Sequence, residues 1–436
     1  MYTVLELLHV LWLELCFSLY LRLRICVNYV DSFRFNFYNS PEPGNQKPTV
    51  IVSKIIFRYK LDIYEFASAK DFICLREYYA RPESVISSDG RVALYCLDRE
   101  NATFIELPKP ITEYSASKAP FVWLHFFRDA QRIIEIPLSE LHRLADHLGD
   151  PQSPIILLWN SGRCGSTLLT NLVAKANPRV LSLSEPDVFT SLFKIRHGCE
   201  SEIENDPEPY VQIVRSALRV YFRSIPGVEG FLVKPRMFVT ALLPFIARAL
   251  PNIRHGLLLR RNAMSTVRSY EKAFRPMISI KKAYFFLNYL PDHLRWRMYP
   301  YRYPTPVENA AIEAGFKYSL LEIMCQLWAE NLLDFVRLES FLAKNTFYFE
   351  DLVSDPKSVL ETIFKLLGLE TPNMTHIREW MKKDSQAESP LSMAAVKENE
   401  ERLTRFESDF AVRMRVKKFM KSISTAGMAR ELVIDC

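Results

Sequence analysis

A short stretch near the middle of the chain combines two glycines, two hydroxyl residues and an arginine in the pattern of a phosphate cradle. Residues 154–173 read PIILLWNSGRCGSTLLTNLV. The apolar start predicts a strand buried on both faces, and leucines at helical spacing follow the turn. Because the first N–H groups of a helix lack intrahelical acceptors, they and the helix dipole favour a bound anion. The sequence therefore predicts an anion-binding loop made by Arg163, Cys164, Gly165, Ser166, Thr167 and Leu168.

The order of residues in this loop differs from that of the nucleoside triphosphatases. Their phosphate loop has a lysine directly after its second glycine. Here Ser166 and Thr167 follow Gly165, and the basic residue, Arg163, comes two places before that glycine. This order resembles the 5′-phosphosulfate loop of the sulfotransferases that use 3′-phosphoadenosine 5′-phosphosulfate (PAPS), and the resemblance implies PAPS as the cofactor.

Two further segments extend the resemblance over roughly residues 154–370. Residues 257–274 predict a buried strand entering a helix, with Arg261 eight positions before Ser269. They look like the family's 3′-phosphate-binding element, where a charged fork and a hydroxyl suit a dianionic phosphate. Residues 347–369 resemble the family's closing structural segment, in which Asp355 and Pro356 predict a helix start and Gly368 its end.

The strand predicted at residues 179–183 leads to Glu185, our candidate general base. Carboxyl ends of parallel strands border the crevice where open α/β sheets bind ligands. Golgi-type sulfotransferases carry an acceptor-activating glutamate at a similar distance after the loop arginine, and Glu185 lies 22 positions after Arg163. Capping of the following helix is the structural alternative for Glu185, and Asp187 shares both interpretations.

The strand predicted at residues 229–233 leads to Lys234, which we expect to contact sulfonate or phosphate oxygens. Cytosolic sulfotransferases place their catalytic histidine two residues after a similar lysine, but Arg236 stands there in this chain. The departure favours Glu185 and a protein closer to the carbohydrate or Golgi type. His197 and His255 remain alternative bases.

The resemblance implies transfer of a sulfuryl group from PAPS to a hydroxyl of a carbohydrate or small molecule. Glu185, Arg163 and Lys234 are the expected catalytic residues, and the cofactor-binding set is the loop together with Arg261 and Ser269. The cysteines form no pair or Cys–His cluster at metal-ligand spacing, so we expect no metal. A P-loop kinase and a catalytically silent protein of the sulfotransferase fold are the alternatives.

The expected fold is a three-layer α/β arrangement, like that of P-loop NTPases, with a parallel sheet flanked by helices and an N-terminal mixed α+β region. We divide the chain into an apolar segment with a turn-rich break (1–47), an α+β region (48–150), the sulfotransferase domain (151–370) and a helical extension (371–436). Strands are expected near residues 49–60, 91–97 and 103–107, and a helix at 138–148. Residues 284–306 are aromatic and basic, residues 384–386 could approach the ligand, and residues 394–424 predict a charged helix.

Composition fits a globular enzyme: 49% of the residues are hydrophobic and 24% are charged. A net charge of +6 suits an anionic ligand but is too small and dispersed for nucleic acid. Residues 4–27 are apolar yet contain Glu14, and a carboxylate in mid-span costs about 2.5–3.5 kcal/mol. We therefore favour a buried or amphipathic helix and a cytoplasmic protein, and leave a Golgi or other membrane anchor open.

Overall fold

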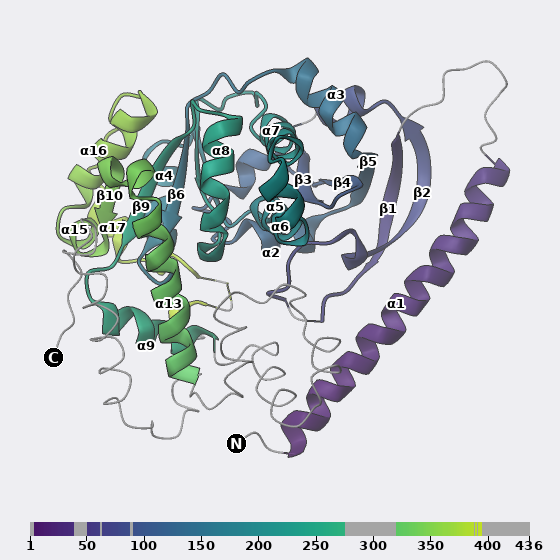
Figure 1. Cartoon of the computed structure of the whole chain (residues 1–436), viewed down its shortest axis with the longest axis horizontal. Coiled ribbons are helices and arrows are strands. Elements are labelled where there is room, and N and C mark those ends of the chain that lie inside the picture. The colour runs from purple at the N-terminus through teal and green to yellow at the C-terminus, as the bar shows by residue number, and fades with distance from the viewer. Residues whose placement is uncertain are drawn as a thin grey trace.

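The computed structural model describes residues 4–38, residues 50–274 except 62, 88 and 89, residues 320–387, and residues 389 and 391–394. The expected break at 39–47, the aromatic segment at 284–306 and the tail from residue 395 onward lie outside the described residues. Figure 1 shows two sheets side by side, with helices packed around them and one long helix along the edge.

A five-stranded parallel sheet positions the predicted loop. Its order is β10-β9-β6-β8-β7, and every pairing is parallel. The strands are β6 (Ile155–Asn160), β7 (Val180–Ser184), β8 (Gly230–Lys234), β9 (Arg254–Leu259) and β10 (Thr346–Tyr348). The strands expected at 179–183 and 229–233 are confirmed one residue later. The central strand, β6, leads directly into the loop.

Helices cover both faces of the parallel sheet, which gives the expected three layers. Side chains alternate along a strand, so Ile156 and Leu158 join a core with α4 and α16, whereas Leu157 and Trp159 face the opposite core. The helices that the structure describes after residue 150 are α4 (Ser166–Ala176), α5 (Asp187–Gly198), α6 (Glu200–Asn205), α7 (Glu208–Tyr221), α8 (Leu243–Ala249), α9 (Ala263–Phe274), α13 (Leu320–Arg337), α14 (Glu339–Leu342), α15 (Phe349–Ser354), α16 (Pro356–Leu367) and α17 (Ile377–Met381).

The closing segment forms α16 with the predicted ends. The Asp355 carboxylate accepts from the backbone N–H of Ser358 at 3.3 Å, Pro356 occupies the first turn, and Gly368 ends the helix with a φ of +70°. These are the N-cap and C-cap roles that the sequence predicts.

The N-terminal region contains a five-stranded antiparallel sheet of order β2-β1-β5-β4-β3. Its elements are β1 (Val50–Arg58), β2 (Phe72–Ala80), β3 (Val92–Leu97), β4 (Asn101–Glu106), α2 (Val122–Asp129), β5 (Arg132–Pro137) and α3 (Leu138–Leu148). The expected strands match β1, β3 and β4, and the expected helix is α3. Strands β2 and β5 were not predicted.

One buried cluster connects the two sheets. It includes Ile105 of β4 and Leu157 of β6, each fully buried, with side chains from α3, α5 and α7. The antiparallel sheet therefore packs into the same core as one face of the parallel sheet. The division at residue 150 stays a prediction.

The apolar N-terminal segment forms α1 (Val4–Tyr38), a helix of 35 residues that runs beyond the expected apolar stretch. In Figure 1 it lies along β2 at the edge of the molecule. Within the part of the chain that the structure describes, no helix combines the length and apolarity needed to cross a bilayer.

Candidate functional site

The turn between β6 and α4 is organised by one carboxamide at the end of the strand. The Oδ1 atom of Asn160 accepts from the backbone N–H of Gly162 at 3.0 Å and from the Ser166 hydroxyl at 3.4 Å. Its Nδ2 donates to the carbonyl of Pro235 at 3.1 Å. Asn160 thus ties the loop to the end of β8, the strand that carries Lys234.

Two glycines let the loop pass close to neighbouring side chains. Gly162 and Gly165 have φ values of +68° and +82°, a region that favours glycine. A Cβ at Gly162 would collide with the Tyr270 hydroxyl and with Met237, and a Cβ at Gly165 would enter the Phe349 ring. The close approach, as well as the turn, therefore requires glycine at both positions.

Arg163 lies between α9 and the 384–387 segment. Its Nε donates to the Ser269 hydroxyl at 2.9 Å, and another guanidinium nitrogen donates to Gln386 Oε1 at 3.3 Å. Burial lowers the pKa of this guanidinium, and the nearby positive charge of Arg260 lowers it further. A group whose charge is disfavoured by burial and by a neighbouring cation would be stabilised by an anion.

Lys234 lies beneath the first turn of α4. Its side chain is only 2% exposed, and its Nζ lies 2.7 Å from Glu185 Oε1 and 3.1 Å from Thr167 Oγ1. Gln386 Nε2 also reaches Thr167 Oγ1, at 3.4 Å. Contacts therefore run without a break from Glu185 through Lys234, Thr167 and Gln386 to Arg163 and on to Ser269.

Glu185 follows the last residue of β7 in a left-handed conformation, with a φ of +59°. Its backbone N–H donates to the carbonyl of Lys234 at 2.6 Å, and its carboxylate is 22% exposed. Burial alone would raise the pKa of this carboxyl, but the positive charges of Lys234 and Arg236 outweigh burial and hold the pKa below its usual value. Glu185 is therefore ionised at neutral pH and can accept a proton only weakly while Lys234 is its partner.

Asp187 and Arg236 form a second pair from the same two strand ends, with 3.0 Å between Arg236 and Asp187 Oδ1. The other oxygen of Asp187 accepts from the backbone N–H of Ala67 at 3.0 Å. The Arg236 guanidinium lies over the rings of Phe66 and Trp123, at 5.2 and 5.0 Å from their centroids. Because Ala67, Phe66 and Trp123 belong to the N-terminal region, this buried pair joins that region to the parallel sheet.

The remaining loop residues help to hold the loop in place. Cys164 is fully buried, and burial raises the pKa of its thiol, so the thiol stays protonated. Leu168 packs against the core on the α16 side of the sheet. Ser166 is buried and bonds to Asn160.

The structure gives Arg261 and Ser269 different partners. The Arg261 guanidinium donates to both carboxylate oxygens of Asp351, at 2.7 and 2.9 Å, and lies 4.0 Å from the centroid of the Tyr348 ring. Ser269 accepts from Arg163. Their joint role in binding a 3′-phosphate stays a prediction.

Arg260, which the sequence analysis did not select, is a second candidate beside Arg261. Its guanidinium lies 4.9 Å from the centroid of the Phe349 ring, and its charge acts on Arg163. Its Nε is buried without a hydrogen-bond partner among the described residues. Successive side chains of a strand point to opposite faces of a sheet. This alternation, continued past the end of β9, could have distinguished Arg260 from Arg261.

The two histidines lie away from the loop. His255 is at the amino end of β9, where Trp159 Nε1 donates to its Nδ1 at 3.1 Å and burial lowers its pKa to about 4. His197 is in the last turn of α5, the end opposite Glu185. Neither position suits a base that acts at the carboxyl ends of the strands.

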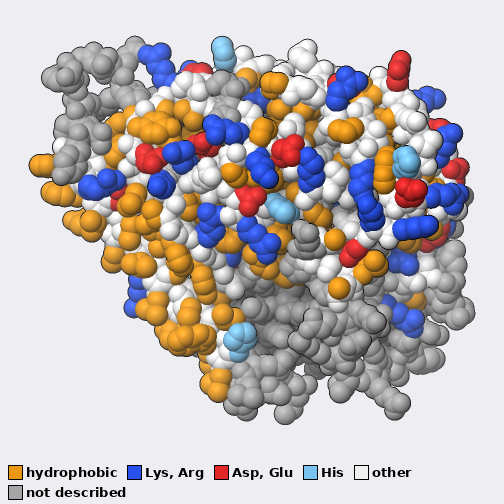
Figure 2. Space-filling view, turned by 180° about the vertical axis from the view of Figure 1, so that it is seen from behind, with side chains coloured by type: hydrophobic (Ala, Val, Ile, Leu, Met, Phe, Trp, Pro, Cys, Tyr) orange, Lys and Arg blue, Asp and Glu red, His pale blue; other side chains and the backbone are white. Residues whose placement is uncertain are grey.

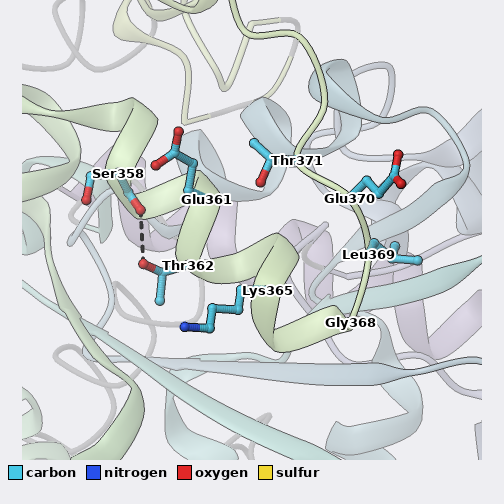
Figure 3. Close-up of a pocket in the computed structure, with 8 residues that line it drawn as sticks. All are labelled: Ser358, Glu361, Thr362, Lys365, Gly368, Leu369, Glu370 and Thr371. Carbon is cyan, nitrogen blue, oxygen red and sulfur yellow. Dashed lines mark hydrogen bonds between the residues drawn. The ribbon is translucent and has the colours of Figure 1, made fainter.

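Figure 3 shows a surface hollow along the outer side of α16. Thr362 lines it and donates to the carbonyl of Ser358 at 3.0 Å, the dashed line in the figure. The helix ends near Gly230, since a Cβ there would lie 3.5 Å from Leu367, and Gly230 begins β8. The part of the hollow at the end of α16 therefore lies near the amino end of β8, away from the loop.

No family model and no curated protein matches the chain. Among solved structures, a sulfotransferase from Alicyclobacillus acidocaldarius is 14% identical with a TM-score of 0.32, over 62% of this chain and 94% of that chain. The sulfotransferase domain of the Synechococcus PCC 7002 olefin synthase is 14% identical with a TM-score of 0.31, over 63% and 96%. A sulfotransferase from Mycobacterium tuberculosis H37Rv is 12% identical with a TM-score of 0.30, over 60% and 79%. Similarity at this level says nothing about cofactor or acceptor.

Proposed function

We propose that the protein is a sulfotransferase that moves a sulfuryl group from PAPS to a hydroxyl of a carbohydrate or small molecule. The observation that carries the proposal is the continuous set of contacts from Glu185 through Lys234, Thr167 and Gln386 to Arg163 and Ser269. It joins a carboxylate to two cations at the start of α4, where an anion is favoured. Such a set suits transfer of a negatively charged group to a hydroxyl.

The residues present fit the anionic groups of such a cofactor. The buried Arg260 Nε has no partner among the described residues, and the pKa of Arg163 is lowered by burial. Arg163, Lys234 and the N–H groups of residues 165–167 would hold the 5′ side, and Arg260 or Arg261 with Ser269 would hold a 3′-phosphate. When bound, PAPS supplies an activated sulfuryl group and a stable bisphosphate leaving group.

Glu185 takes the acceptor proton in this proposal. With Lys234 at 2.7 Å the carboxylate is a weak base. The negative charge of an anion next to Lys234 would partly offset the positive charge that Lys234 presents to Glu185. The pKa of Glu185 would then rise toward the range in which a general base works. Lys234 and Arg163 stabilise the negative charge that develops as the oxygen of the acceptor attacks.

A P-loop kinase is the first alternative. Lys234 reaches the first turn of α4 from a neighbouring strand, and a kinase could use it in place of the missing loop lysine. The second alternative is a silent protein that keeps the fold for binding. Ligand preference separates the kinase from the sulfotransferase without knowledge of the acceptor, and a transfer assay separates the enzyme from the silent protein.

Thermal unfolding with added nucleotides tests the proposal. A ligand that binds only the native state at one hundred times its Kd adds about 2.7 kcal/mol of stability. We expect 3′-phosphoadenosine 5′-phosphate to raise Tm by several degrees without magnesium, and ATP to raise it much less. A larger, magnesium-dependent shift with ATP would support the kinase and contradict the sulfotransferase. If the bisphosphate binds, radiolabelled sulfate transfer to a broad hydroxyl panel distinguishes an enzyme from a silent protein.

A further inference from the structure

Helix α1 attaches to the protein through aromatic rings, such as that of Phe35 at 4.9 Å from the Tyr79 ring, and through polar side chains. The Tyr20 hydroxyl donates to the carbonyl of Lys70 at 2.9 Å, and Arg24 Nε donates to the carbonyl of Phe72 at the same distance. The buried Asp31 carboxylate accepts from the backbone N–H of Arg76, also at 2.9 Å. The inner face of the helix thus uses hydroxyl, guanidinium and carboxylate groups along the edge strand β2.

The outer face of α1 is apolar as well, whereas the outer face of a surface helix is usually polar. Positions 12, 15, 19, 23, 26, 30 and 33 recur in steps of three and four, so they form one stripe along the helix. Six of them carry large apolar side chains that are 51–75% exposed: Trp12, Leu15, Leu19, Leu23, Val30 and Phe33. Cys26, at the centre, is also exposed. Figure 2 shows hydrophobic side chains gathered along this flank of the molecule.

The charges beside the stripe are mainly positive. Arg22 and Arg34, both on α1, are exposed. Of the acidic residues of α1 whose side chains the structure describes, Asp31 is buried and pairs with Arg34 at 2.7 Å, and Glu14 is half-buried with its Oε1 atom inside the protein. Long basic side chains at the border of an apolar surface can place their charges among anionic headgroups.

We propose that α1 binds the surface of an anionic lipid bilayer, with its axis in the membrane plane and its outer stripe among the acyl chains. A straight helix of 35 residues is about 52 Å long. A planar membrane contacts such a ridge along its whole length, and the exposed Arg22 and Arg34 beside the stripe suit anionic headgroups. Because Tyr20, Arg24 and Asp31 hold the inner face against residues 70–76, the helix lies along the bilayer and keeps the edge of the antiparallel sheet beside it.

Vesicle flotation of the full chain tests this proposal. The probe is vesicles of phosphatidylcholine and phosphatidylserine at a ratio of about 3:1, with pure phosphatidylcholine as comparison. We expect the protein to float with the anionic vesicles and the double variant Leu19→Glu/Leu23→Glu to bind at least ~10-fold more weakly. Both side chains point away from β2, so circular dichroism and Tm should match those of the unsubstituted chain.

A matched pair of substitutions elsewhere controls for added charge. Phe341 and Val353 are also exposed apolar residues, but they lie on α14 and α15. The variant Phe341→Glu/Val353→Glu should bind vesicles like the unsubstituted chain. Equal weakening of both double variants, or no flotation at all, would overturn the proposal.

A local readout identifies the surface that meets the lipid. Brominated acyl chains should quench part of the tryptophan fluorescence, and Trp12→Phe, which keeps the apolar surface, should remove that part. Light scattering tests the alternative that the stripe contacts a second copy of the chain. If the chain is a dimer that Leu19→Glu/Leu23→Glu separates, and vesicles do not bind, the stripe is a contact between copies and the membrane proposal fails.

Discussion

At the scale of single residues, Glu185 and Lys234 depend on each other. Lys234 is almost fully buried, and its nearest anionic partner among the described residues is Glu185. Removing one partner of a buried pair leaves an uncompensated charge and typically costs 3–5 kcal/mol. Any test of Glu185 as a base must therefore separate catalysis from folding.

If Glu185 is the general base that we propose, Glu185→Gln should lower kcat by roughly 10²–10⁴-fold while affinity for 3′-phosphoadenosine 5′-phosphate changes little. Steady-state kinetics and calorimetry on folded protein measure the two effects. Asp187→Asn is the matched control, since it also breaks a carboxylate–cation pair at the same strand ends. It should reduce stability but leave kcat largely intact. Similar kcat losses in the two variants would remove the special role of Glu185.

The two adjacent arginines after β9 make a second residue-scale prediction. Arg261 is already paired with Asp351, whereas Arg260 has no carboxylate partner among the described residues. We expect Arg260→Ala to cost about 1.5–3 kcal/mol in affinity for the bisphosphate, the range of charged hydrogen bonds, and Arg261→Ala to cost less. Calorimetry with adenosine 5′-phosphosulfate is the control, because it lacks the 3′-phosphate. A larger loss in Arg261→Ala would return the role to Arg261.

At the scale of elements, the predictions from the sequence succeeded where a strand meets a turn and a helix. The run before Asn160 is buried on both faces and continuously apolar, and α16 carries its capping residues in the sequence. Strand β2 was missed because it is an edge strand with Arg76 and Glu77 in its middle. Strand β5 was missed because it ends at Pro137 and runs directly into α3 at Leu138, with no turn residues between them to mark its end.

The candidate site was predictable to the extent that its residues lie at strand ends. Arg163, Glu185 and Lys234 meet there because parallel strands end at one edge of the sheet. The contact of Gln386 with Arg163 joins positions 223 residues apart, so the sequence could suggest only that the 384–386 segment approaches the ligand. The pairing of Arg163 with Ser269 depends on how α9 packs, which the spacing of Arg261 and Ser269 did not reveal.

Gly162→Ala tests the close packing of the loop element. Gly162 and Gly227 both have positive φ, but only Gly162 has neighbours where a Cβ would stand. Gly162→Ala and the control Gly227→Ala should both be destabilised by the strained backbone conformation. Gly162→Ala should lower the free energy of unfolding by a further ~1–3 kcal/mol through overpacking. Urea denaturation measures the difference. Equal destabilisation would mean that Tyr270 and Met237 move aside at no cost.

At the scale of the whole molecule, the shared core predicts one cooperative unit. Ile105 of the antiparallel sheet and Leu157 of the parallel sheet are fully buried in one cluster. Ile105→Ala and Leu157→Ala should each lower the free energy of unfolding by about 2–5 kcal/mol. Hydrogen exchange should show the same loss of protection for β4 and β6 in both variants. Loss confined to the substituted sheet would instead support independent folding on either side of residue 150.

Arg163 has a left-handed backbone, with a φ of +48°, and this has a consequence for directed evolution. A non-glycine residue in this conformation stores roughly 1–3 kcal/mol of strain, and burial disfavours the charge of the Arg163 guanidinium as well. Glycine or asparagine would relieve both. A selection for thermostability alone would therefore enrich replacements at Arg163. The resulting proteins would be more stable and would bind an anion more weakly. Rounds of selection on this chain should alternate heat challenge with a ligand-binding screen.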